Sequence, residues 1–203
     1  MHSTLSDDEL LTLLRAGDEG AFVTLYRRRQ GAIYRFALRM SGSETMAEDV
    51  TQEVFMTLMR GDGRYDSSRG AFSAYLFGVA RNQVLRRLEK DRFLSPIYED
   101  DEGRDSSTPE SLITLNDPLG DLTRKEMIAS VRQAVLALPP HYREVVVLCD
   151  LHEMSYADAS VALGCAVGTV RSRLHRARAL LVDKLRAYRA AEFGHTDSAN
   201  CLV

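Results

Sequence analysis

Residues 155–178 read SYADASVALGCAVGTVRSRLHRAR, a stretch with the pattern of a helix-turn-helix. Ser155 precedes an apolar segment and is a suitable cap for a short helix. Gly164 follows that segment and can supply the positive φ of a sharp turn, while Ser160, four residues earlier, is small enough for two helices to cross closely. The pattern therefore predicts two helices joined by a turn at Gly164.

The second helix of this unit, expected from about residue 168 to 190, has an apolar face and a basic face. The residues expected to pack inward are Val170, Leu174, Ala177 and Leu181. The polar residues around the other face are Thr169, Arg171, Ser172, Arg173, His175, Arg176 and Arg178. Between residues 167 and 190, seven bases stand against the single acid Asp183, whereas a solvated helix normally mixes both signs of charge. Such a face favours DNA, because arginine can bond guanine edges while hydroxyl groups and a helix N-terminus can bond phosphates.

The charge of the whole chain hides this basic segment. The chain has 203 residues with 26 Lys and Arg against 29 Asp and Glu, so its net charge is −3, which would argue against nucleic acid if it were spread evenly. Residues 99–121 alone carry eight acids against Arg104. Charge is therefore segregated into a basic helix and an acidic linker.

Helical periodicity extends over most of the chain, without the alternation that indicates strands, so we expect an all-α fold. Apolar spacing and capping residues predict helices near 7–15, 18–40, 43–60, 71–92, 123–138, 142–151, 155–164 and 168–190. Between them, residues 94–122 hold three of the five prolines and read as a flexible acidic linker. Two small helical domains follow, at 1–93 and 123–190, with a disordered tail at 191–203.

No pattern in the chain indicates catalysis, a metal site or a cofactor. The three cysteines are not in CxxC spacing, the five histidines have no metal-ligand spacing, and there is no phosphate-binding glycine loop. No apolar run approaches the roughly 20 residues of a membrane-spanning helix, and the acidic start MHSTLSDDEL is unlike a signal peptide. We therefore expect a cytoplasmic protein that is not an enzyme and does not insert into membranes.

Two further surfaces are expected on the first domain. In the helix near 43–60, Asp49, Gln52 and Glu53 are neighbours on one polar side, although spacing alone leaves a plainly solvated face as an equal alternative. The helix near 71–92 is basic, with aromatic residues interleaved at its start, as single-stranded DNA requires for stacking and for its phosphates. Core packing is an open alternative for Phe72 and, less strongly, for Tyr75.

Four segments, two in each expected domain, resemble the sequences of one protein family. The segments AEDVTQEVFMTL, GAFSAYLFGVARNQVLRRL, LPPHYREVVVL and MSYADASVALGCAVGTVRSRLHRARALL are similar, in this order, to those of extracytoplasmic-function (ECF) sigma factors of bacterial RNA polymerase. The resemblance implies a region 2 helical bundle and a region 4 helix-turn-helix. It also implies three partners, which are core RNA polymerase, promoter DNA and an anti-sigma factor. The contacts with core polymerase would be made to the β′ clamp coiled coil and the β flap.

The resemblance also assigns residues to each surface. Those that match the segment docking on the β′ clamp coiled coil are Asp49, Gln52, Glu53 and Phe55. A second set matches the segments that melt the minus-ten element and hold a flipped base. Its members are Asp66, Ser67, Ser68, Arg69, Phe72, Tyr75, Arg81, Asn82, Arg86 and Arg87, and Asn82 stands at the position that lines the base pocket. The basic helix expected near residues 168–190 matches the helix that enters the major groove at the minus-thirty-five element. Tyr75 stands where many members have tryptophan, and Ala159 and Ser160 replace the commoner isoleucine and alanine.

Two other classes of protein compete with this interpretation. A stand-alone helix-turn-helix regulator would bind duplex DNA as a dimer without polymerase. A sigma mimic that only sequesters an anti-sigma factor would have little reason to keep Arg171, Arg173 and Arg176 pointing outward, as we expect them to be.

Overall fold

The structure is a computed structural model that describes residues 4–61, 65–94 and 118–193, and these residues form helices and connections without strands. The helices of the N-terminal half are α1 (Asp7–Arg15), α2 (Glu19–Ser41), α3 (Glu44–Met59), the short η1 (Ser67–Arg69) and α4 (Phe72–Leu94). Those of the C-terminal half are α5 (Pro118–Leu136), α6 (Pro140–Val146), the π-helical turn η2 (Val147–Leu151), α7 (Tyr156–Leu163) and α8 (Val167–Phe193). The expected all-α fold is confirmed.

Polar caps set several helix boundaries. Ser6 and Glu9 form a reciprocal capping box at α1, and Asp18 and Ser43 cap α2 and α3 by accepting a backbone N–H three residues on. Ser155 caps α7 in the same way. These caps satisfy N–H groups that have no partner inside the helix, which explains why local sequence was sufficient to predict where these helices begin.

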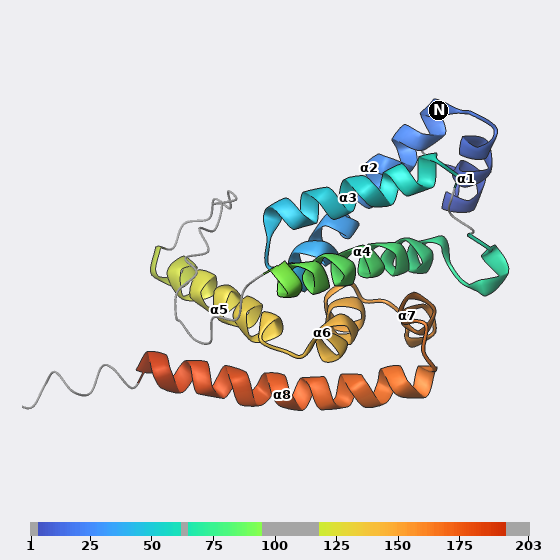
Figure 1. Cartoon of the computed structure of the whole chain (residues 1–203). Helices are drawn as coiled ribbons and strands as arrows, with labels where there is room; N and C mark the ends of the chain where they lie inside the picture. The colour runs from blue at the N-terminus through green and yellow to red at the C-terminus, as the bar shows by residue number, and fades with distance from the viewer. Residues whose placement is uncertain (1–3, 62–64, 95–117, 194–203) are drawn as a thin grey trace, which may run out of the picture.

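The N-terminal half is a helical bundle in which α2, α3 and α4 pack around fully buried side chains such as Leu25, Phe36 and Val50 (Figure 1). Ring contacts add to this core, with Phe36 edge-on to Phe77 at 5.4 Å between centroids. The bundle is the scaffold that presents the outer faces of α3 and α4.

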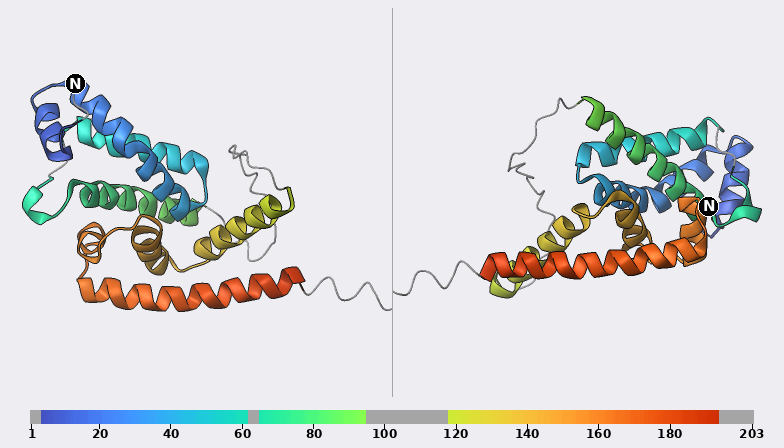
Figure 2. Two further views of the ribbon diagram at one scale, coloured as in Figure 1. Left: turned by 180° about the vertical axis from the view of Figure 1, so that it is seen from behind. Right: turned by 60° about the horizontal axis from the view of Figure 1, so that its bottom comes forward.

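In the C-terminal half, α8 runs along one side of α5, α6 and α7 (Figure 2). The turn between α7 and α8 is made by Gly164, whose φ of +63° lies in the left-handed region that favours glycine. The helix-turn-helix expected over residues 155–178 is therefore present, with its turn at the expected glycine.

The two halves pack directly against one another, an arrangement that sequence patterns did not reveal. Helix α7 packs against α4, and α5, α6 and η2 contact α2, so one buried apolar cluster runs through both halves. His152 sits at this contact, edge-on to Phe77 at 5.0 Å. Arg39 donates to the Leu151 carbonyl at 3.2 Å, and Arg143 reaches back to the Met40 carbonyl. We call this packed arrangement the closed form. Its two halves are held together by polar as well as apolar contacts.

Several expected boundaries need correction. Helix α4 includes Leu94, α5 begins at Pro118 rather than 123, and α8 extends to Phe193, so the ends of the expected linker and the start of the expected tail are helical. Proline is tolerated in the first turn of a helix, where its missing N–H would have no partner, and Pro118 opens α5 in this way. Residues 95–117 of the linker and 194–203 of the tail lie outside the described residues.

Candidate nucleic-acid and protein interfaces

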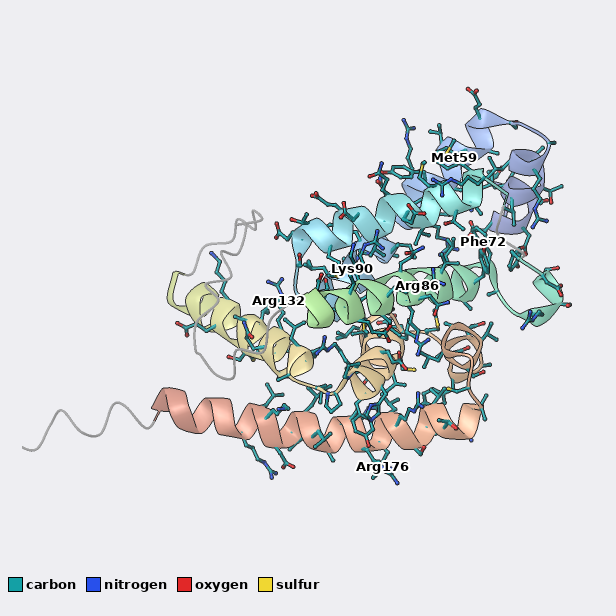
Figure 3. The ribbon with its side chains drawn as sticks, in the orientation of Figure 1. Met59, Phe72, Arg86, Lys90, Arg132 and Arg176 are labelled. Atoms are coloured by element: carbon teal, nitrogen blue, oxygen red, sulfur yellow. The ribbon has the colours of Figure 1, made fainter. Side chains whose placement is uncertain are left out.

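Helix α8 presents the basic face expected from the sequence. Val170, Leu174 and Ala177 are at most 2% exposed and fix the rotation of the helix against α6 and α7. The side chains exposed on the other side are Arg171, Ser172, His175, Arg176 and Arg178, and Thr169 is half-buried. Figure 3 shows Arg176 pointing away from the rest of the molecule. No acidic residue lies on α8 before Asp183, so the charges that the helix itself brings to this face are positive, as a DNA phosphate backbone requires.

Two arginines of this helix are held by carboxylates of the C-terminal half. Arg178 makes a two-pronged ion pair with Asp150, with nitrogen to oxygen distances of 2.5 and 3.1 Å. Arg173, expected to point outward, is half-buried and lies 3.4 Å from a carboxylate oxygen of Glu144. The expectation of a free Arg173 is therefore corrected, because a buried carboxylate of α6 attracts its guanidinium inward.

Glu144 is the polar centre of the contact between the two halves. Its side chain is buried, and its residue is 1% exposed. Arg81 of α4 donates Nε to one carboxylate oxygen at 2.6 Å and a second nitrogen to the other oxygen at 3.3 Å, while Arg173 approaches from α8. Two guanidinium groups thus compensate one buried charge. Sequence reasoning missed Glu144, and the only local signal was an acid directly before the apolar run Val145–Leu148.

The residues assigned to minus-ten DNA gather along a groove of about 330 Å³ between α4 and α7. Asp66, Arg69, Tyr75, Arg81 and Asn82 line it from the N-terminal half. The other wall is residues 161–164, from the end of α7 and the turn. The structure therefore brings these five residues together, but beside a helix of the other half.

The loop at one end of this groove is tied together locally. Asp66 accepts from the backbone N–H and the hydroxyl of Ser68 at 2.9 and 2.7 Å, and these bonds lower the pKa of its carboxyl. Asp66, Ser67, Ser68 and Arg69 are exposed. Tyr65, which precedes them, donates its hydroxyl to Asp8 at 2.6 Å, and burial with this bond raises its pKa to about 12.

The aromatic residues at the start of α4 differ in role. Phe72 is 3% exposed and edge-on to Tyr65 at 5.2 Å, which corresponds to the core alternative. Tyr75 is half-buried, its pKa is raised by burial, and it lines the groove. Of these two aromatic residues, Tyr75 is the one that lines the groove.

Farther along α4, the basic residues Arg86 and Lys90 are exposed to solvent. Asn82 and Arg86 are exposed, and Arg87 is half-buried and donates to Gln83 at 3.1 Å. Figure 3 shows Arg86 and Lys90 along the same helix. This basic stripe continues from the groove toward the end of α4.

A second, larger groove of about 750 Å³ lies between α2 and α3. Gln52 and Phe55 line it, together with Met56 and Met59, which are 37% and 58% exposed. Phe55 is itself 2% exposed, so it forms the floor of the groove, and its assignment to the docking segment stays a prediction. Its ring packs edge-on against Tyr26 at 4.8 Å, which explains its burial.

The acidic residues of α3 lie beside this groove. Asp49 is exposed, and Glu53 is half-buried and pairs with Arg60 at 3.3 Å. The opposite wall, which sequence reasoning missed, comes from α2 and includes Arg27, Gln30 and Tyr34. Helix α2 has one apolar and one polar face, as most surface helices do. Its sequence therefore did not indicate that part of its surface lines a groove.

Among the residues that the structure describes, no group of three or more His, Cys, Asp or Glu side chains is arranged to hold a metal ion. No described helix is long and apolar enough to cross a membrane. Cys149 and Cys165 are free thiols, and burial raises the pKa of Cys149 to about 11.

Comparisons with known proteins agree on one family. The family model for sigma-70 region 2 matches residues 25–93, and the model for sigma-70 region 4 matches residues 128–181. The chain is 33% identical over 175 residues to the ECF RNA polymerase sigma factor SigE of Mycolicibacterium smegmatis, in a match covering 83% of this chain and 64% of SigE. It is 32% identical over 177 residues to SigW of Bacillus subtilis, covering 85% of this chain and 93% of SigW.

Solved structures show the same relationship. CnrH, in complex with the cytosolic domain of CnrY, has a TM-score of 0.64 and 27% identity, over 89% of this chain and 97% of CnrH. The sigma factor RpoE of Bartonella quintana, in complex with the anti-sigma factor NepR, has a TM-score of 0.56 and 25% identity, over 77% of this chain and 91% of RpoE.

Proposed function

We propose, from the premise that this chain belongs to the ECF sigma factors of RNA polymerase, that it directs core polymerase to a set of promoters and opens them. Residues 1–93 and 123–190 are the two functional domains in this proposal, joined by the linker 94–122. The family consists of transcription initiation factors, and we assign no catalytic activity to the chain. It acts where polymerase acts, in the cytoplasm.

The observation that carries the proposal is the exposed basic face of α8, presented by a helix-turn-helix. Arg171, His175 and Arg176 are exposed and close enough in sequence to span neighbouring bases of one major groove. Thr169 and Ser172 stand near the start of the helix, where its unpaired N–H groups also attract phosphate. This face is the proposed reader of the minus-thirty-five element.

The groove lined by Tyr75 and Asn82 is the proposed site for a flipped base of the minus-ten element. A base can offer its Watson-Crick edge only after it leaves the stack, at a cost of a few kcal/mol that contacts in the pocket must offset. Tyr75 offers a ring for stacking, and Asn82 offers an amide that both donates and accepts. Arg86 and Arg87 lie farther along α4 and would hold the backbone of the same strand.

The groove between α2 and α3 is the proposed docking site for the β′ clamp coiled coil. It combines exposed methionine side chains, which adapt to a partner helix, with the neighbouring acids Asp49 and Glu53. A helix with apolar and basic residues fits this combination. The β flap would contact the C-terminal domain.

An anti-sigma factor is a further proposed partner. The support is that the related sigma factor RpoE is bound to the anti-sigma factor NepR in a solved structure. The experiment is affinity capture of the tagged full chain from its own cells, followed by transcription assays with and without each captured protein.

The function is tested by selecting bound fragments from a genomic DNA library with the purified chain, with and without core polymerase. The proposal expects enrichment of fragments that share two separated sequence elements, and only when core polymerase is present. Enrichment of palindromic sites by the chain alone would instead indicate a stand-alone regulator.

A further inference from the structure

Helix α1 is joined to the groove assigned to minus-ten DNA through Tyr65, the residue directly before the loop Asp66–Arg69. Tyr65 donates its hydroxyl to the carboxylate of Asp8 at 2.6 Å. Arg15 donates a guanidinium N–H to the Tyr65 carbonyl oxygen at 3.3 Å. Asp8 and Arg15 are seven residues apart, which is close to two helical turns, so both lie on one face of α1. That face therefore holds Tyr65 by its side chain and by its backbone.

Helix α1 is itself fixed to the bundle. Asp7 accepts from Arg28 at 2.7 Å and from Arg29 at 2.6 Å, both on α2. Leu10 and Leu11 are buried in the same core as the apolar side chains of α2. Figure 1 shows α1 and the short η1 at the same end of the bundle. The contacts to Tyr65 therefore connect the loop to a helix that is held in place by ion pairs and by the core.

Tyr65 also contacts the aromatic residues at the start of α4. Its ring is edge-on to Phe72 at 5.2 Å and lies 5.6 Å from the ring of Tyr75. Tyr65, Asp66 and Tyr75 all line the groove between α4 and α7 in the closed form. The Asp66 carboxylate in turn accepts from the backbone N–H of Ser68 at 2.9 Å. A displacement of Tyr65 would thus shift both the start of the loop and the ring of Tyr75.

The bond from Tyr65 to Asp8 lies at the surface of the bundle. The Asp8 side chain is exposed, whereas Tyr65 is half-buried. Burial, together with the bond to Asp8, raises the pKa of the Tyr65 hydroxyl to about 12, so at neutral pH the phenol keeps the proton that it donates. An ionised acceptor makes such a bond short and strong. Removing the carboxylate would therefore free the phenol to move without leaving a cavity in the core.

We propose that α1 is a part of the minus-ten reader, in which its contacts to Tyr65 set the position of the loop Asp66–Arg69 and of the Tyr75 ring. Asp8, Arg15 and Tyr65 are positioning residues in this proposal, since they act on the bases through the loop and through Tyr75. Helix α1 ends before residue 25, where the match to sigma-70 region 2 begins. The inference rests on the proposed function of the chain as a sigma factor.

Three substitutions in the full chain separate the hydrogen bond from other effects. Asp8→Ala removes the acceptor, and Tyr65→Phe removes the donor while keeping the ring. Asp8→Asn removes the charge but keeps an oxygen that can accept from the phenol. Glu19→Ala is the matched control, because Asp8 and Glu19 are both exposed acids in the first turn of a helix of this bundle.

The measurement uses core polymerase, the full chain and a promoter fragment selected with both from a genomic library. The rate of promoter-complex formation is compared between this fragment and versions with single base changes in the minus-ten or the minus-thirty-five element. We expect Asp8→Ala and Tyr65→Phe each to reduce discrimination at the minus-ten element by about threefold to tenfold, the range for loss of one hydrogen bond. The double variant should lose no more than the worse single variant, because both substitutions remove the same bond.

The other readouts should stay near those of the parent. Discrimination at the minus-thirty-five element and affinity for core polymerase should change by less than about twofold in every variant, since both depend on other surfaces. Asp8→Asn should recover most of the minus-ten discrimination that Asp8→Ala loses. Glu19→Ala should match the parent at both promoter elements.

The inference is overturned if either Asp8→Ala or Tyr65→Phe keeps the minus-ten discrimination of the parent. Equal losses at both promoter elements would also overturn it, because α1 would then support the chain in general. The same holds if Asp8→Asn performs no better than Asp8→Ala, since the hydrogen bond would then not be what positions the loop. If the parent chain forms no promoter-specific complex with core polymerase, the proposed function is rejected instead, whatever the variants do.

Discussion

Among the basic residues of α8, Arg173 and Arg178 differ from Arg171 and Arg176 in having a carboxylate partner. Arg178 is committed to Asp150 and Arg173 to Glu144, and an arginine that reads a base must first give up such a partner. Arg176 has no acid nearby on its own helix and points outward (Figure 3). We therefore expect Arg171 and Arg176 to contact DNA, and Arg173 and Arg178 to hold the helix in position.

The first prediction compares Arg176→Ala with Arg173→Ala. We expect Arg176→Ala to weaken promoter binding by the polymerase complex by about 1–3 kcal/mol with unchanged thermal stability, as for an arginine that bonds a base edge. Arg173→Ala should lower the melting temperature, because Glu144 loses one of two partners for a buried charge. Competition binding and thermal melting of both variants check this division, and equal melting temperatures for the two would contradict it.

The second prediction concerns His152, which is packed against Phe36 and Phe77. Burial, followed by repulsion from Arg39 and Arg35, lowers the pKa of His152 to about 4. Its neutral form is favoured in the folded protein, so its contribution is fully present above the ordinary pKa of 6.5 and is lost as the pH falls from 6.5 toward 4. We expect the free energy of unfolding to decrease over that interval.

The measurement is urea unfolding at closely spaced pH values between 7 and 5, where most carboxylates remain ionised, for the parent and for His152→Gln. The variant should be less stable at pH 7 but should lose less stability on acidification. Parallel curves for the two proteins would show that His152 is not the group that titrates.

At the scale of helices, local sequence was sufficient wherever a cap and an apolar stripe coincide. Ser6, Asp18 and Ser155 each mark a helix start that the structure has, and Gly164 marks the turn of the helix-turn-helix. The start of α5 was misplaced because Pro118 follows an acidic segment rich in proline, where first-turn proline and loop proline look alike. The π-helical turn η2 was also invisible, since a change in hydrogen-bond register leaves no mark on apolar periodicity.

Candidate site residues were predictable only as faces of single helices. The outward face of α8 follows from the spacing of Val170, Leu174 and Ala177. The pairing of Arg173 and Arg81 with Glu144 joins three helices, and the groove beside Tyr75 needs α7 as a wall. Such features depend on how helices dock, which one-dimensional patterns do not encode.

The third prediction uses two glycines with equal space around them but different backbone conformations. A Cβ at either Gly164 or Gly168 would meet no atom within 4 Å, yet Gly164 has φ +63° and Gly168 lies in the regular helix α8. Gly164→Ala should cost about 1–2 kcal/mol from left-handed strain, whereas Gly168→Ala should be neutral or stabilise by up to about 1 kcal/mol.

The measurement is the urea concentration at the midpoint of unfolding, determined for both variants and for the parent. Opposite shifts from the parent are expected. If Gly164→Ala were as stable as Gly168→Ala, the turn would not depend on the left-handed conformation.

For the molecule as a whole, a net charge of −3 is the sum of separate acidic and basic surfaces. The acids Asp49 and Glu53 lie beside the α2/α3 groove, and the exposed arginines lie on α4 and α8. We therefore expect a protein partner and a nucleic-acid partner to bind different parts of the same chain.

The fourth prediction is that Asp49→Ala combined with Glu53→Ala removes most binding to core polymerase while the helical content and melting temperature stay close to the parent. The reason is that both residues are at least partly exposed, and the ion pair that Glu53 makes is with the exposed Arg60, so little folding energy is lost. Glu19→Ala combined with Asp183→Ala changes the net charge equally on other surfaces and is the control. Retained core binding by the first pair would contradict the docking assignment.

The central claim is that this chain gives core polymerase its promoter specificity, and transcription with purified core polymerase on a genomic library tests it most directly. Mapping the 5′ ends of the transcripts should reveal start sites that require the chain and that share two upstream elements. Those transcripts should disappear with Arg171→Ala combined with Arg176→Ala. Start sites that are the same with and without the chain would contradict the account.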